Sequence, residues 1–125
     1  MVDIGDYLYL DLKPVERARA LIKTEAVVFG NRFDVLSGLL YFHSSSKTAI
    51  TAVADLVFED AEQFFHDVKT FYPQSDFAAE VARNALSAIA NYRQSKNLTI
   101  PLLEDMANYC NRVRGKKEKK DELTV

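Results

Sequence analysis

Two carboxylates and an imidazole, those of Glu59, Glu62 and His66, are spaced to lie on one face of a helix, each about one turn from the next. A carboxylate and an imidazole one turn apart can share a divalent metal ion. Helical di-metal proteins, however, supply such pairs from two helices together with further glutamates. The only other histidine is His43, and no carboxylate lies one helical turn from it. We therefore expect a solvent-exposed acidic face, with no metal, no other cofactor and no catalytic residue.

Two further side chains could act as nucleophiles. Ser44 and Lys47 satisfy the Ser-x-x-Lys spacing of β-lactamases and penicillin-binding proteins, but the companion Ser-Asp-Asn and Lys-Thr-Gly motifs are missing. We interpret Ser44–Ser46 as the N-cap of the helix that follows. Cys110 continues an apolar helical stripe, which predicts a buried thiol with the role of a small hydrophobic side chain.

The charge of the chain is weak in total and unevenly distributed. The 16 basic and 18 acidic residues give a net charge of -2. Residues 112–125 carry six basic and three acidic side chains, which leaves ten basic and fifteen acidic ones in residues 1–111. A protein that coats nucleic acid needs a basic body, because phosphate neutralisation supplies most of that affinity. The distribution therefore argues against binding over the whole surface and leaves contact through a basic segment open.

The recurrence of apolar residues at helical intervals predicts an all-α fold, a compact bundle of about five helices with a long central helix. The predicted helices cover residues 14–29, 32–42, 47–72, 76–94 and 100–114. Gly30 is placed as the C-terminal end of the first helix. Residues 5–12 alternate weakly between apolar and polar and are expected to form a short extended N-terminal arm. We expect a single helical domain over residues 1–115 and a charged, disordered C-terminal tail over residues 116–125.

The helix over residues 47–72 is the longest that we predict, about 39 Å at 1.5 Å per residue. Large apolar side chains recur every seven residues along it in two rows, Ile50, Val57, Phe64 and Phe71, and Phe58, Phe65 and Tyr72. Its N-terminal half has few polar residues, so we expect it to be enclosed nearly all round. Val57 and Phe64 are expected to be buried. The alternative is that an apolar row forms a groove or coiled-coil seam for a partner.

Three features of the remaining helices follow from the same reasoning. The alanine-rich helix over residues 76–94 is expected to pack closely against helix 47–72. Ser75 and Thr99 are the expected N-caps of the last two helices. The second helix carries two apolar rows at helical spacing, Phe33, Leu36 and Leu40, and Val35, Leu39 and Phe42.

Length and composition limit the class of protein. A chain of 125 residues with 48% hydrophobic residues can form one domain with a core of its own. No apolar run reaches the roughly 18–20 residues of a membrane span, and the first residues lack the basic segment of a secretory signal. The single cysteine excludes an internal disulfide. We expect a cytoplasmic protein without membrane association.

These patterns favour a non-catalytic helical interaction module. Such a module would be a small subunit or adaptor of a larger assembly, and nucleoprotein assemblies are among the candidates. Its expected partner is another protein or a second copy of the chain. The first alternative is a small protein that contacts nucleic acid through its first helix and basic C-terminal segment; the second is a metal-dependent enzyme on the acidic face. The candidate partner-binding residues are Lys13, Arg17, Arg19, Lys23, Arg112, Arg114, Lys116, Lys117, Glu59, Glu62 and His66.

Overall fold

The computed structural model describes residues 14–115, and within them the fold is all-α, as predicted. The expected extended arm over residues 5–12 and the expected tail over residues 116–125 lie outside the described residues. The described elements are α2 (Pro14–Phe42), the short 3-10 helix η1 (Ser44–Ser46), α3 (Lys47–Phe71), α4 (Phe77–Ser95) and α5 (Ile100–Val113).

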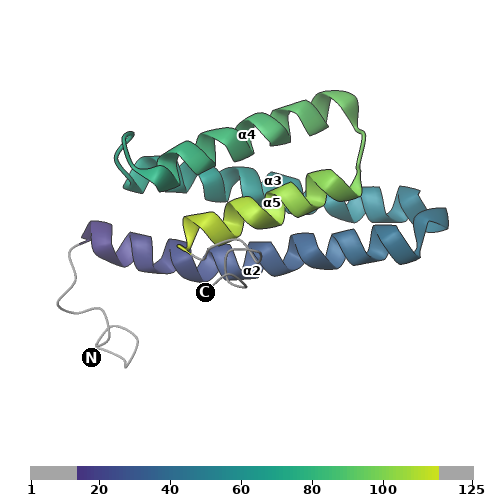
Figure 1. Ribbon diagram of the computed structural model, residues 1–125, viewed down its shortest axis with the longest axis horizontal. Helices are drawn as coiled ribbons and strands as arrows, with labels where there is room; N and C mark the ends of the chain where they lie inside the picture. Colours follow the sequence, from purple (N-terminus) through teal and green to yellow (C-terminus); the bar gives the residue numbers. More distant parts are fainter. Residues whose placement is uncertain (1–13, 116–125) are drawn as a thin grey trace, which may run out of the picture.

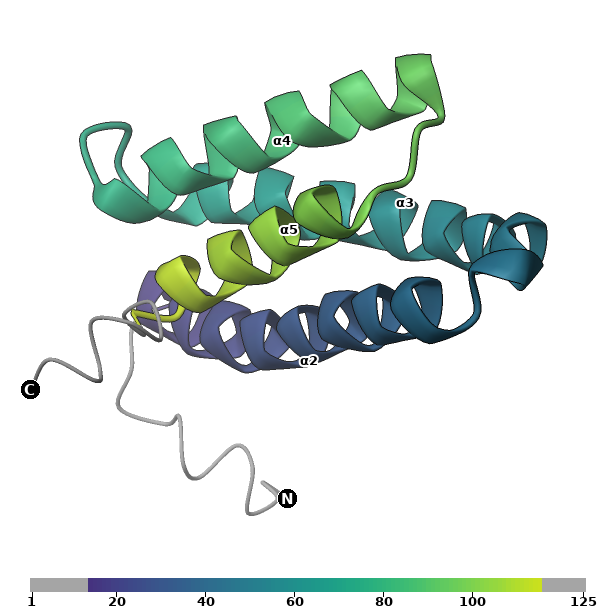
Figure 2. The same cartoon turned by 45° about the vertical axis from the view of Figure 1, so that its right-hand side comes forward.

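The four α-helices of the described chain form an up-and-down bundle in which each helix runs antiparallel to the one before it (Figure 1). Helix α2 packs against α3 and α5, and α4 packs against the same two helices from the other side. Figure 2 shows the same arrangement from a second direction. The core lies between these four helices, as expected for a bundle with short connections.

The prediction of about five helices is wrong for the described residues, because the segments 14–29 and 32–42 form one continuous helix, α2. Buried residues continue at helical spacing across the expected break. Gly30 is itself buried against α5, where a Cβ atom would lie 3.5 Å from the Cβ of Cys110. Gly30 therefore lies inside a helix at its contact with α5, where a Cβ atom would make ordinary van der Waals contact, and does not end a helix.

The prediction of a long central helix is also wrong. Helix α2 has 29 residues and α3 has 25, and none of the four helices is surrounded by the others. In the N-terminal half of α3 the side facing the core is buried, but Ala49, Ala52, Val53 and Leu56 are exposed. The end of the α2–α3 hairpin extends beyond the turn between α4 and α5 in both views (Figures 1 and 2). The exposure of the four side chains shows that no described helix covers the side of α3 that carries them.

Aromatic side chains form much of the core. Phe33 of α2 packs edge-on against Phe58 of α3 with ring centroids 5.2 Å apart, and Phe58 stacks on Tyr92 of α4 at 4.3 Å. Phe64 is 2% exposed, which confirms that part of the prediction. Val57 is only partly buried, because it lies at the edge between α2 and α3, so the expectation that it is fully buried is wrong.

One of the three predicted N-caps is wrong, and a second lacks the side-chain hydrogen bond of a cap. Thr99 caps α5 as predicted, since its hydroxyl accepts a hydrogen bond from the N–H of Leu102 at 3.2 Å. Helix α4 is capped by Asp76, which accepts from the N–H of Ala78 at 2.8 Å, and not by Ser75. Ser46 stands at the N-cap position of α3, as predicted, but its side chain makes no capping hydrogen bond.

Truncation of Phe64 should destabilise the bundle far more than truncation of Val57. Removing a fully buried phenylalanine ring leaves a cavity, for which we expect a loss of about 3–5 kcal/mol for Phe64→Ala. Val57→Ala should lose about 1 kcal/mol, since its side chain is only half covered. Urea denaturation of both variants measures this. A Phe64→Ala variant within about 0.5 kcal/mol of the natural chain would contradict the described core.

Candidate functional site

Basic residues from the two ends of the described chain meet on one surface. The first turns of α2 and the last turn of α5 border a cleft of about 490 Å³ whose lining includes Arg19, Lys23 and Arg112. Lys23 also lines an adjoining hollow together with Arg114. The structure thus brings together four of the basic residues that the sequence analysis named.

The other predicted basic residues do not belong to this cleft or are not described. Arg17 is exposed and lines neither hollow. Lys13, Lys116 and Lys117 lie outside the described residues. The convergence therefore depends on α2 and α5 being antiparallel neighbours.

Arg19 joins α2 to the C-terminal end of α3. Its Nε donates a hydrogen bond to the carbonyl oxygen of Phe71 at 2.6 Å, and its guanidinium lies 4.8 Å from the ring centroid of Tyr72. The acidic residues Glu16 and Asp76 also line the cleft, so its charge is mixed. Burial raises the pKa of the Tyr72 phenol; Arg19 opposes this shift and Asp76 adds to it. These residues connect helices of the bundle, and their mixed charge does not favour strong binding of an anion in the cleft.

The acidic face of α3 is only partly a free surface. Glu59 and His66 are exposed, as expected, but Glu62 is half-buried and forms an ion pair with Arg93 of α4 at 3.0 Å. One predicted partner-binding residue therefore joins two helices of the bundle. Among the described residues, no three His, Cys, Asp or Glu side chains are grouped so that they could hold a metal ion.

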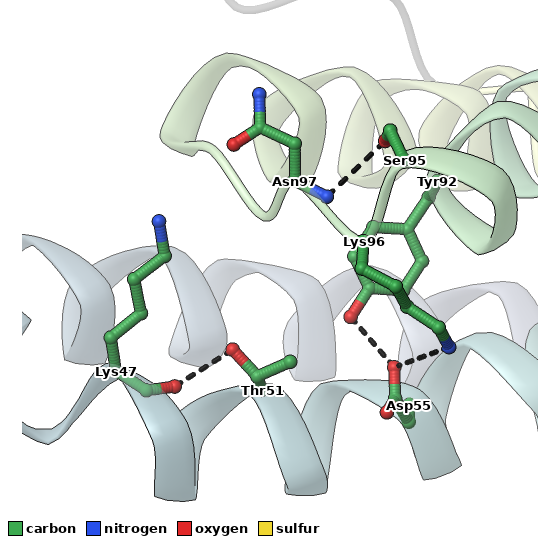
Figure 3. Close-up of polar contacts among 7 residues, drawn as sticks. All are labelled: Lys47, Thr51, Asp55, Tyr92, Ser95, Lys96 and Asn97. Atoms are coloured by element: carbon green, nitrogen blue, oxygen red, sulfur yellow. Dashed lines mark hydrogen bonds and ion pairs between the residues drawn. The ribbon is translucent and has the colours of Figure 1, made fainter.

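A polar cluster between α3 and α4 was not found by sequence reasoning (Figure 3). The Tyr92 hydroxyl donates to Oδ1 of Asp55 at 2.7 Å, and Nζ of Lys96 lies 3.6 Å from the same oxygen. Burial raises the pKa of Tyr92, and the hydrogen bond to the Asp55 carboxylate raises it further. Asp55 and Tyr92 are 37 residues apart, so only the pairing of α3 with α4 reveals the cluster. The cluster holds these two helices together.

Cys110 is fully buried, as predicted. Burial, with a smaller effect of Asp34, raises the pKa of its thiol to about 12. Because the thiolate is the nucleophilic form, this position does not favour covalent chemistry.

An exposed apolar surface lies on α2 and α3. We define the α2–α3 apolar face by its exposed side chains, Val28, Val35, Leu39 and Phe42 of α2 and Val53 and Leu56 of α3. A groove of about 530 Å³ lies within it, lined by four of these residues together with Val57, Leu36, Asn31 and Arg32. Exposure reaches 60% at Val35, 64% at Leu56 and 75% at Phe42.

Sequence reasoning placed none of these residues among the candidate binding residues. The available signal was the pair of apolar rows in residues 32–42, of which the row with Phe33 is buried and the row with Val35 is exposed. A helix that is apolar on two sides has either two covered faces or one face left for a partner. Only the bundle shows that no described helix covers the second row.

Comparison of the chain with known protein families, with curated proteins and with solved structures gives no match. Within residues 14–115, no helix is both long enough and apolar enough to cross a membrane.

Replacement of Tyr92 by phenylalanine should weaken the α3–α4 contact. The loss of a hydrogen bond to a carboxylate should reduce the free energy of unfolding by about 1.5–3 kcal/mol, whereas Lys96→Ala should cost no more than about 1 kcal/mol. Because the pKa of Tyr92 is raised in the folded state, its contribution is complete below about pH 10, the value of a free tyrosine, and is lost as the pH rises further.

Urea denaturation at several pH values measures both effects. The natural chain should lose stability above about pH 10, and Tyr92→Phe should lose less over the same interval. Any loss of stability above about pH 10 that remains in the Tyr92→Phe variant comes from other groups, including Tyr72, whose pKa is also raised. Equal stability of Tyr92→Phe and the natural chain at neutral pH would show that the Asp55 hydrogen bond contributes nothing.

Proposed function

We propose that the chain is a helical interaction module and that the α2–α3 apolar face is its docking surface. The observation that carries the proposal is the exposure of Val35, Phe42 and Leu56 together on two neighbouring helices. Single exposed apolar residues are common on soluble proteins, but a contiguous apolar patch of this kind marks an interaction site.

The spacing of the exposed residues favours a helical partner. Leu21, Val28, Val35 and Phe42 follow one another at intervals of seven along α2, and each is exposed. This interval is that of a coiled-coil seam, in which side chains of one helix fit between those of another. A groove between two antiparallel helices can accept an amphipathic helix along its length.

The core does not use this face. The buried side of α2 is formed by the row that includes Ile22, Phe29 and Phe33, which faces α3 and α5. The face can therefore dock a partner without opening the bundle. In this proposal the module is a small subunit or adaptor, and its partner is a protein or a second copy. An intracellular setting agrees with the single unpaired Cys110.

Two added charges on the face should abolish docking and leave the fold intact. We expect Val35→Asp with Leu56→Asp to keep the helical circular dichroism and most of the thermal stability, because both side chains are mostly exposed. The matched control is Ser87→Asp with Asn91→Asp, which adds two aspartates at exposed positions of α4. Affinity capture from extract, with each chain as bait, should lose its specific partners only with the face variant.

Two results would contradict this proposal. The face variant could retain the same partners as the natural chain, in which case docking uses another surface. Alternatively, the face variant could unfold while the α4 control stays folded, in which case Val35 and Leu56 belong to the core.

A second candidate function is contact with nucleic acid through the basic cleft between α2 and α5. The observation in its favour is that Lys23 lies near Arg112, in the cleft, and Arg114, in the adjoining hollow, although both are far from it in sequence. The mixed charge of the cleft and the structural use of Arg19 make it the weaker candidate.

Salt dependence tests this second candidate. If the cleft binds phosphate, Lys23→Ala with Arg114→Ala should weaken binding of a labelled oligonucleotide at low salt and lower the salt slope by about 0.9 per lost phosphate contact. Near 0.5 M salt, where the Debye length is roughly 4 Å, the difference should vanish. Lys69→Ala, at an exposed position of α3, is the control. Fluorescence anisotropy that shows no binding, or binding independent of salt, would contradict the candidate.

A further inference from the structure

The α2–α3 apolar face carries one charge of each sign, Arg32 on its α2 side and Asp60 on its α3 side. Arg32 is exposed and lines the groove, and its guanidinium lies 5.2 Å from the ring centroid of Phe29. Asp60 is exposed and follows Val53 by seven residues, so it projects from the same side of α3. Within residues 14–115 neither side chain forms an ion pair.

The core fixes the level of these two charges along the bundle. Phe29 packs against Phe64, and Phe33 packs against Phe58, each pair with ring centroids 5.2 Å apart. Residue 32 of α2 is therefore level with about residue 60 of α3. By this register Arg32 and Asp60 stand at about the same level on the face, the cation on α2 and the anion on α3.

The same register sets large side chains of α2 level with small ones of α3. Leu39 is level with about Val53, and Phe42 is level with about Ala49. Phe42 is among the largest exposed side chains of the described chain, whereas Ala49 and the neighbouring Ala52 are small and exposed. At the level of Phe42 the face is thus bulky on α2 and small on α3.

We propose that this face pairs with the same face of a second copy, about a twofold axis parallel to the helices. Such an axis places α2 of each copy over α3 of the other, antiparallel and at the same level. Arg32 then meets Asp60 of the second copy, and Phe42 meets Ala49 of the second copy. Because the axis is twofold, each contact occurs twice. The two hairpins together form a four-helix arrangement around the axis.

Complementarity within one face favours a second copy over a foreign helix. The proposal rests on the interaction function proposed above, and it adds the identity and orientation of the partner. A helix from another protein would need only the apolar groove. It would give no role to the opposite charges of Arg32 and Asp60, which stand at the same level along the bundle. In the twofold pair, the same surface supplies both partners of each contact: the cation and the anion, and the large and the small side chain. Reversal of either charge would place like charges together.

Charge reversal in separate chains tests the arrangement. Sedimentation velocity of the full chain over a range of concentrations should show a dimer. We expect Arg32→Glu alone and Asp60→Arg alone each to weaken dimerisation at least tenfold. An equimolar mixture of the two variants should recover the dimer, because each mixed dimer then pairs opposite charges at both positions. Arg83→Glu, an exposed position on α4, is the control and should leave the dimer unchanged.

The mixture separates pairing between chains from pairing within one. If Arg32 and Asp60 acted only within a chain, the two changes would compensate only in one doubly substituted chain and the mixture would not recover. Failure of the mixture to recover, or a dimer that neither reversal weakens, would overturn the proposed arrangement.

A chain that is monomeric at every concentration would also overturn the proposal. If the variant with Val35→Asp and Leu56→Asp still lost its captured partners, the proposed docking function of the face would be retained, and its partner would be another protein. A monomer that dimerises only after deletion of residues 1–13 would assign the face to that segment, which equally overturns pairing in the natural chain.

Discussion

The packing of α2 against α3 through aromatic rings is the contact on which the other features depend. Phe29 with Phe64 and Phe33 with Phe58 lock the two longest helices at one register. Phe58 extends this packing to Tyr92, so the same rings also position α4. Because aromatic rings are large and their preferred contacts are directional, a shift along the helix axis would separate every pair at once. This register determines which residues are enclosed and which form the exposed face.

Helical periodicity predicted the fold class well because periodicity reports the buried side of each helix. The burial of Phe64 and Cys110 and the cap at Thr99 follow from local patterns that tertiary contacts did not override. Gly30 misled the prediction, because a glycine before the end of a helix and a glycine at a helix contact have the same local sequence. The two cases differ only in which residues pack against the glycine, and a single sequence does not give that information.

The exposed apolar face was harder to predict than the core, for a physical reason. An apolar row that packs against a domain's own helices and one that waits for a partner have the same composition and spacing. The N-terminal half of α3, which includes Leu56, was expected to be enclosed because nothing in its neighbourhood marks it as exposed. The charged residues named as candidates were, in contrast, partly used within the bundle, Arg19 at Phe71 and Glu62 at Arg93. Charge alone therefore does not distinguish a partner site from a joint between helices.

In the proposed arrangement, the α2–α3 apolar face is open in the single chain and becomes covered when two copies meet. Methyl NMR with a soluble paramagnetic agent measures this directly for Val35 and Leu56, with the buried Val68 and Leu103 as internal references. We expect strong relaxation of the face methyls in dilute samples and progressive protection as the protein is concentrated, with the core methyls protected throughout. Face methyls that are protected as fully as Val68 at every dilution, or that stay exposed at every concentration, would contradict the proposed arrangement.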